Sequence, residues 1–158
     1  MMLDKVVVSD ILSRSCVVTD LVAGNKVEVI EYLSQLLFEE NIINDKPAFI
    51  RDVLAREELG PTGFDNQVAI PHGKSSAVRE TRMAVAQLRH PVDWETEDDV
   101  AVRLVILFAV RNADSGIGHI KVLASVSVAL GDDEIVEQLM QAESNEALYR
   151  LIVNNTGL

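Results

Sequence analysis

Apolar positions recur at helical spacing in several stretches of the chain, and residues that cap helices precede them. Asn25 stands before the first stretch, with Glu28 three residues later, where it can close a capping box. Asp45 and Pro47 open the second stretch as a cap and a first-turn proline. Together with three apolar runs near the end of the chain, these patterns predict helices over residues 25–40, 45–60, 117–130, 132–140 and 144–152.

Short apolar runs between the helical stretches predict β-strands. The run 100–110 is almost continuously apolar, which is typical of a strand covered on both faces. Residues 60–66 are rich in turn-forming residue types and are expected to be irregular. The predicted strands cover residues 17–22, 68–70, 83–88 and 100–110. The resulting order of strand, two helices, three strands and three helices predicts an α+β fold with helices on both faces of a small mixed sheet.

Composition and charge narrow the class of protein. A chain of 158 residues suits one domain, residues 1–158, and its net charge of -11 makes nucleic acid a poor partner. No apolar run reaches the roughly 18 residues of a membrane span, and Asp4 and Asp10 interrupt any signal-like start, so we expect no membrane insertion. A single cysteine, Cys16, favours a small buried apolar role over a reactive thiol and fits the cytoplasm.

His72 has the most distinctive local context of the three histidines. Pro71 before it fixes its own backbone and favours an extended residue ahead of it. Gly73 after it permits close approach of the backbone beside the ring. We therefore expect the imidazole on a turn at a strand end, where sites in α/β folds are built. A histidine that merely caps the strand is an equally good interpretation of this tripeptide.

The other two histidines differ in context. His119 follows a glycine-rich segment and precedes a long apolar run, which places it in the first turn of a helix. The partial positive charge there favours a bound anion, so His119 could donate to a phosphoryl oxygen, although a first-turn histidine on its own is more often a surface residue. His90 precedes a proline in a polar loop, and we assign it no role.

Arg56 and Lys74 are the cations nearest to His72 in the sequence. The guanidinium of Arg56 matches two phosphate oxygens at once, but a cation near a helix C-terminus also complements the helix dipole. Lys74 is interpreted as a solvated flank that could guide a partner. Metal-ligand spacing, a serine nucleophile elbow, a Walker loop and a dinucleotide fingerprint are absent, so these residues point to phosphoryl transfer at a histidine.

The segment Arg56-Glu57, followed by Pro61-Thr62-Gly63 and by residues 68–74, resembles the type 2 enzyme IIA domains of the bacterial phosphoenolpyruvate-dependent sugar phosphotransferase system. These domains form the fructose, mannitol and nitrogen-regulatory class. Residues 25–30, 102–110 and 118–123 are also similar to the family, so the resemblance covers the whole chain. It implies a three-layer α/β/α sandwich with a mixed sheet.

The resemblance also implies roles and partners. His72 would carry the phosphoryl group, with His119 as a second catalytic residue and with Arg56, Thr62 and Gly73 binding the phosphoryl oxygens. The donor would be the phosphocarrier HPr, and the acceptor would be a cysteine of an enzyme IIB domain of a sugar permease. No metal or other cofactor is expected, because protein cations would neutralise the transferred charge.

Two rival functions are compatible with the same residues. A regulatory protein of the nitrogen branch would carry phosphate on His72 and act by binding another protein. A non-catalytic interaction domain, like the cytoplasmic domain of anion exchangers, would lack the histidine chemistry, and the set of Arg56, His72 and His119 argues against it. Gln67 stands where many relatives have glycine, which could alter the approach to His72.

Overall fold

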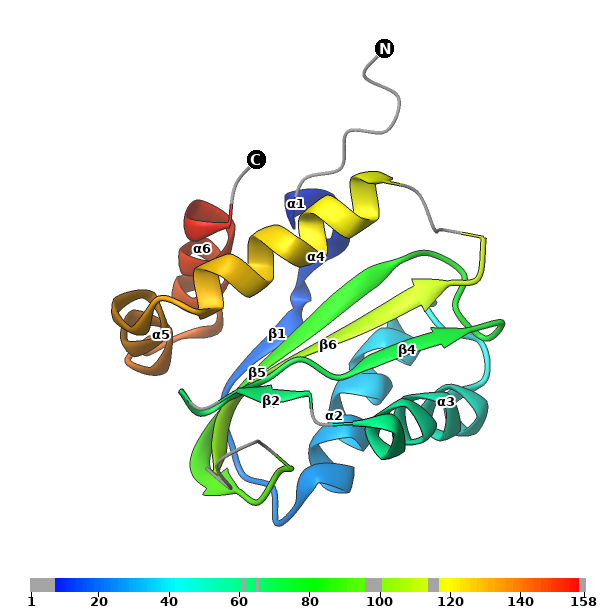
Figure 1. The fold of residues 1–158 in the computed structure, drawn as a ribbon, viewed down its shortest axis with the longest axis horizontal. Coiled ribbons are helices and arrows are strands. Elements are labelled where there is room, and N and C mark those ends of the chain that lie inside the picture. The colour runs from blue at the N-terminus through cyan, green and yellow to red at the C-terminus, as the bar shows by residue number, and fades with distance from the viewer. Residues whose placement is uncertain (1–7, 61, 65, 96–100, 114–116, 157–158) are drawn as a thin grey trace.

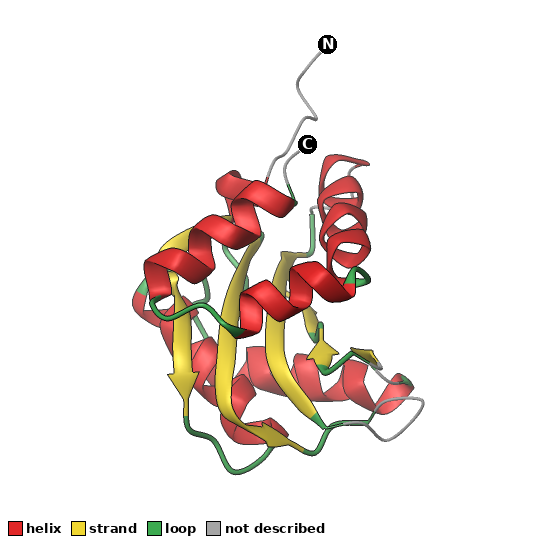
Figure 2. Ribbon diagram, turned by 90° about the vertical axis from the view of Figure 1, so that its left-hand side faces the viewer, coloured by secondary structure: helices red, strands yellow, loops and turns green. Residues whose placement is uncertain are grey.

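A mixed β-sheet lies between two layers of helices (Figures 1 and 2). The computed structural model describes residues 8–60, 62–64, 66–95, 101–113 and 117–156. Its helices are α1 (Val8–Ile11), α2 (Lys26–Glu39), α3 (Lys46–Leu59), α4 (Ile117–Leu130), α5 (Asp133–Met140) and α6 (Asn145–Asn155). Its strands are β1 (Leu12–Leu21), β2 (Gly63–Phe64), β3 (Val68–Ala69), β4 (His72–Ser75), β5 (Arg82–Val92) and β6 (Val102–Arg111). The three-layer α/β/α fold with a mixed sheet is therefore confirmed.

Strand β6 is the centre of the sheet. The strands run in the order β1-β5-β6-β3-β2, and β4 pairs with β6 beyond the end of β3. β5 and β6 are antiparallel, whereas β3 and β4 both run parallel to β6. His72 pairs with Phe108 and so lies at the start of β4, near the carboxyl end of the central strand.

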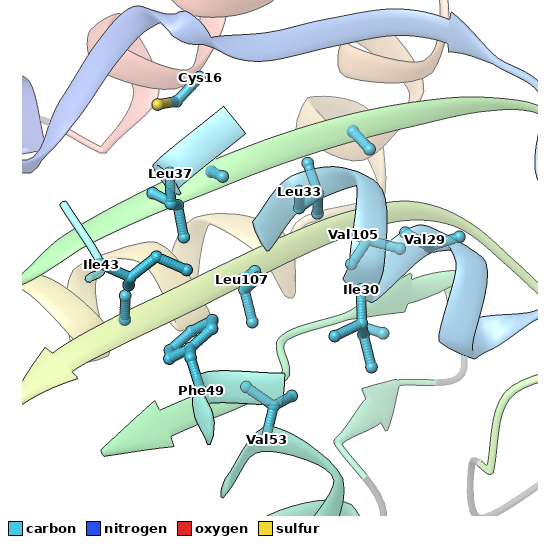
Figure 3. Close-up of a cluster of buried hydrophobic side chains, with 14 of the residues drawn as sticks. Cys16, Val29, Ile30, Leu33, Leu37, Ile43, Phe49, Val53, Val105 and Leu107 are labelled. Carbon is cyan, nitrogen blue, oxygen red and sulfur yellow. The ribbon is translucent and has the colours of Figure 1, made fainter. Parts of the chain in front are cut away.

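The side chains of β6 alternate between two hydrophobic cores. Val105 and Leu107 pack under α2 and α3, in the cluster drawn in Figure 3. Leu104, Ile106 and Phe108 pack on the opposite face, against residues of α1, α4, α5 and α6. Burial on both faces is what the continuously apolar run predicted. Burying side chains of this size stabilises the fold by about 1.5–3 kcal/mol each.

The predicted caps begin the helices at the expected residues. The side chain of Asn25 accepts a hydrogen bond from the amide of Glu28 at 2.9 Å, and α2 begins one residue later. Asp45 accepts from the amide of Ala48 at 3.1 Å at the start of α3. Ser144 caps α6 in the same way. Each cap satisfies an amide that has no partner within the helix.

Several strand boundaries differ from the sequence-based expectation. β1 begins at Leu12, not at residue 17, and the short helix α1 precedes it. β1 is an edge strand, and its early polar residues concealed the pattern: Arg14 bonds Glu146 of α6 at 2.8 Å and lies over the ring of Tyr149. Within the segment expected to be irregular, residues 63 and 64 form β2, because they pair with β3.

The position of Cys16 tests whether this residue has a structural or a reactive role. Cys16 is buried in the core beneath α2, and burial raises the pKa of its thiol to about 11 (Figure 3). Its small apolar role is therefore supported over a reactive one.

Among the described residues, no helix is both long enough and apolar enough to cross a membrane.

Candidate phosphohistidine site

The half-buried imidazole of His72 stands at the edge of the sheet, at the first residue of β4. The sequence predicted a turn at this position, but β4 begins here because the carbonyl of Pro71 already accepts the amide of Phe108 from β6, at 2.9 Å. Pro71 has no amide hydrogen to donate, so it suits a position where the chain passes from one short strand to the next.

The Nδ1 atom of His72 lies 2.7 Å from the carbonyl oxygen of Ile70. A carbonyl only accepts hydrogen bonds, so in the neutral ring Nδ1 carries the hydrogen and Nε2 carries the free lone pair. Burial lowers the pKa of His72, and the positive charge of Arg56 lowers it further, while the bond to Ile70 opposes the shift. The lowered pKa favours the neutral ring, in which Nε2 carries the free lone pair.

Strand alternation determines what faces each side of this segment. The ring of His72 meets the ring of Phe108 edge-on, with centroids 6.3 Å apart, so it lies on the face covered by α4. Gly73 faces the opposite layer, where an added Cβ would lie 2.6 Å from Cγ2 of Val53 and 2.7 Å from Cε1 of Phe49. Glycine is therefore required at position 73 for β4 to pack closely on α3.

Arg56 lies in the last turn of α3, and its Nη1 donates to the carbonyl of Gly60 at 3.2 Å. This bond is the helix-end role that the sequence left open. The same guanidinium is near enough to His72 for its charge to lower the pKa of the ring. The structure therefore gives Arg56 both a structural contact and a position within electrostatic reach of the imidazole.

Hydrogen bonds connect the loop after α3 to the histidine. The carbonyl of Thr62 accepts the amide of Ile70 at 3.0 Å, and the carbonyl of Ile70 in turn contacts the His72 ring. The hydroxyl of Thr62 donates to the carboxylate of Glu57 at 2.5 Å. Thr62 thus holds the loop in place with its side chain, and its predicted contact with a phosphoryl group stays a prediction.

Glu57 is a buried carboxylate whose importance the sequence did not indicate. Besides Thr62, it accepts a bond from the indole nitrogen of Trp94 at 2.9 Å, and the ammonium of Lys26 lies 3.6 Å away. The charge of Glu57 also acts on His72, in the direction opposite to that of Arg56. A carboxylate directly after Arg56 and a lone tryptophan in a polar segment were the available signals, but their contact depends on the tertiary fold.

The structure places the remaining candidates as follows. His119 is in the first turn of α4, as predicted, and its side chain lies outside the part of the structure that is described. Lys74 and His90 are exposed. Gln67 has a φ of 71°, in the left-handed region that favours glycine, which accounts for the glycine expected at this position. Gln67 lies five residues before His72 in the sequence, and a fully extended chain of that length spans about 16 Å.

Known proteins are similar to this chain in sequence and in fold. The family model for the phosphoenolpyruvate-dependent sugar phosphotransferase system, EIIA 2, matches residues 10–155. The 2-O-alpha-mannosyl-D-glycerate-specific EIIABC component of Escherichia coli is 36% identical over 131 residues, which are 82% of this chain and 20% of that protein. The chain therefore spans about a fifth of that relative.

Two solved structures superimpose on this one. Nitrogen regulatory protein IIA-Ntr from Neisseria meningitidis has a TM-score of 0.83 at 30% identity, over 90% of this chain and 97% of that chain. Enzyme IIA of the E. coli mannitol system, in complex with phosphorylated enzyme IIB, has a TM-score of 0.72 at 28% identity, over 87% and 94% of the two chains. With the family match covering nearly all of its residues, this chain belongs to the type 2 EIIA family of the phosphoenolpyruvate-dependent sugar phosphotransferase system.

Proposed function

We propose that this chain is a phosphocarrier, which accepts a phosphoryl group from phospho-HPr on His72 and passes it to a cysteine of an enzyme IIB domain. The observation that carries the proposal is the hydrogen bond between Nδ1 of His72 and the carbonyl of Ile70. It supports a neutral ring with a defined nucleophilic nitrogen, which phosphoryl transfer to a histidine requires.

The transfer is an exchange of one phosphorus bond for another. Nε2 of His72 attacks the phosphorus of the donor phosphohistidine, the donor nitrogen leaves with its electron pair, and a phosphoramidate forms on this chain. Onward transfer reverses the roles: a thiolate attacks the phosphorus and Nε2 is the leaving group. Both steps keep Nδ1–H on the Ile70 carbonyl, which stabilises the positive character that the ring gains while Nε2 bonds phosphorus.

Arg56 supplies positive charge beside the reacting group in this proposal. Its effect on the pKa of His72 supports a position within electrostatic reach of a phosphoryl group on Nε2. We assign His119 to donate to a phosphoryl oxygen, from the helix layer that the His72 ring faces. Gly73 contributes by letting β4 sit close to α3, and Thr62 by holding the loop that contacts Arg56.

The proposed acceptor rests on a relative. The E. coli mannitol enzyme IIA was solved in complex with phosphorylated enzyme IIB. Fructose and mannitol are the sugar class that we propose for the permease, and the cytoplasm is the compartment in which this exchange would occur. The proposal treats residues 1–158 as one enzyme IIA domain.

A second function is favoured by the similarity to nitrogen regulatory protein IIA-Ntr. In that case His72 would still be phosphorylated, and the phosphorylation state would control binding to another protein. The histidine chemistry is common to both functions, so a separate experiment must distinguish them.

Phosphorylation is tested by incubating the chain with enzyme I, HPr and radiolabelled phosphoenolpyruvate. The wild-type chain is expected to acquire label, and His72→Ala is expected to acquire none. His90→Ala is the matched control, because His90 is exposed on β5 and is expected to leave labelling unchanged. Labelling of His72→Ala at the wild-type rate would refute the proposal.

The labelled protein then separates transport from regulation. On addition of an enzyme IIB domain of the fructose or mannitol class, a transport phosphocarrier loses its label to the IIB cysteine within the mixing time. Retention of the label, together with a binding partner that prefers one phosphorylation state, would favour the regulatory function.

A further inference from the structure

A cavity lies away from the histidine site, between α5 and the start of β6. Its volume is about 580 Å³, within the range of small-molecule sites. In Figure 1, α5 lies at the left of the sheet, whereas β4 extends to the right. The cavity is lined mainly by polar and charged side chains from the turn before β3, from β6 and from α5, and of the residues discussed at the histidine site only Gln67 contributes to it.

Two polar atoms of the residues that line the cavity lack partners. Nε of Arg103 and Oδ1 of Asn66 are both buried and have no hydrogen-bond partner among the described residues. Each side chain is nevertheless held in place by its other end. Nη2 of Arg103 donates to the carbonyl of Leu88 at 3.4 Å, and Nδ2 of Asn66 donates to the carbonyl of Leu130 at 2.5 Å. Such unpaired buried atoms are costly, and a ligand that pairs with them would remove that cost.

The charges of the cavity are separated between its two walls. The guanidinium of Arg103 is on β6, while Asp133 and Glu137 are exposed one helical turn apart on α5. Within the described part of the chain, Arg103 forms no ion pair with either carboxylate. Glu137 instead accepts a bond from Nε2 of Gln141 at 3.3 Å. The cavity thus offers a cation to one end of a ligand and anions to the other.

Apolar groups complete the lining on the α5 side. Val136 is buried and Met140 is half-buried, and both line the cavity. Methionine adapts its shape to different apolar ligands. An apolar ligand side chain would therefore find contact surface between the two charged walls.

We propose that this cavity binds a free α-amino acid with an apolar side chain. The ligand carboxylate pairs with the guanidinium of Arg103, including its unpartnered Nε. The ligand ammonium donates to Oδ1 of Asn66 and faces the carboxylates of Asp133 and Glu137. A simple anion would be repelled by α5 and a simple amine by Arg103, so the arrangement selects a zwitterion.

Calorimetric titration of the full chain with leucine and with methionine tests the proposal. At least one of them is expected to bind with a dissociation constant below about 1 mM. 3-Methylbutylamine and 4-methylpentanoate, which are leucine without its carboxylate and without its ammonium, are expected to bind at least about tenfold more weakly. Absence of binding by both amino acids, or equal binding of either analogue, would overturn the proposal.

Variants and NMR locate the binding. Arg103→Gln is expected to lose at least about tenfold in affinity, and Glu137→Gln, an exposed change that leaves the core intact, is expected to weaken binding severalfold. Arg89→Gln, which removes an exposed arginine paired with Asp20, is the matched control and should bind as wild type. Ligand-induced shifts of wild-type amide signals should centre on Asn66, Arg103 and α5. Shifts centred on His72 and Arg56 instead would contradict the proposed site, whether or not Arg103→Gln folds.

Discussion

Nδ1 of His72 and the carbonyl oxygen of Ile70 are 2.7 Å apart, across the single residue Pro71. Because proline restricts the backbone between them, the carbonyl of Ile70 and the ring of His72 keep a fixed relative position. The carbonyl of Ile70 therefore determines which nitrogen of the ring is free, and the choice is made by the backbone and not by another side chain.

This relationship predicts that phosphorylation occurs on Nε2 and not on Nδ1. The hydrogen on Nδ1 is engaged by Ile70, so only Nε2 presents a lone pair. Nitrogen–phosphorus couplings in the phosphorylated protein, labelled with nitrogen-15 histidine, distinguish the two isomers. A phosphoryl group found on Nδ1 would contradict the prediction and would mean that the imidazole ring rotates away from Ile70 before it reacts.

The lowered pKa of His72 predicts a specific pH dependence. Burial, reinforced by Arg56, disfavours the charged ring, so the pKa lies below its usual 6.5. The rate of phosphoryl acceptance should therefore decline as the pH falls, with a midpoint below 6.5. NMR titration of the ring, compared with a short peptide of the same local sequence, measures the shift. A midpoint at or above that of the peptide would contradict the prediction.

The same shift affects stability with a defined sign. Between the lowered pKa and 6.5, the unfolded chain binds a proton at His72 that the folded chain does not. Acid therefore favours unfolding. The part of the free energy of unfolding that depends on a neutral His72 is fully present above pH 6.5 and is lost as the pH falls through that window. Urea unfolding of the wild type and of His72→Gln across this range should show a steeper loss for the wild type.

Gly73→Ala is expected to destabilise the protein by about 1–3 kcal/mol, because the new Cβ would overlap Val53 and Phe49 of α3. The displacement of β4 would also slow phosphoryl acceptance at His72. Urea unfolding and the labelling assay measure the two effects. Gly131→Ala is the matched control: its Cβ would lie 3.4 Å from the carbonyl oxygen of Val128, an ordinary contact, so we expect a change within about 0.5 kcal/mol. Equal effects of the two substitutions would contradict the packing argument.

Gln67→Gly is expected to stabilise the protein by about 1 kcal/mol, because a glutamine at φ 71° is held in a conformation that only glycine adopts without cost. Gln67→Ala keeps the strain and should show no such gain. Asn41→Gly, at a φ of 60°, is a second control with a smaller expected gain, since asparagine tolerates this region. Thermal and urea unfolding measure all three variants, and a destabilised Gln67→Gly would show that the side chain contributes more than the strain costs.

Much of the fold was predictable from local patterns. The caps at Asn25, Asp45 and Ser144 mark helix starts through contacts within four residues, so their effect is visible in the sequence. The apolar run of β6 is likewise a local signal. By contrast, β2 and β4 are strands only because β3 and β6 lie beside them, and no local pattern contains that information.

For the site, the sequence by itself determined the residue types: a histidine between proline and glycine, an arginine at a helix end, and a second histidine at the start of a helix. Only the tertiary structure decided how they act. It oriented the His72 ring through Ile70, brought the charge of Arg56 within electrostatic reach of that ring, and joined Glu57 to Trp94 and Lys26. These contacts link residues from different layers, and their energies depend on distance and burial, which sequence spacing does not encode.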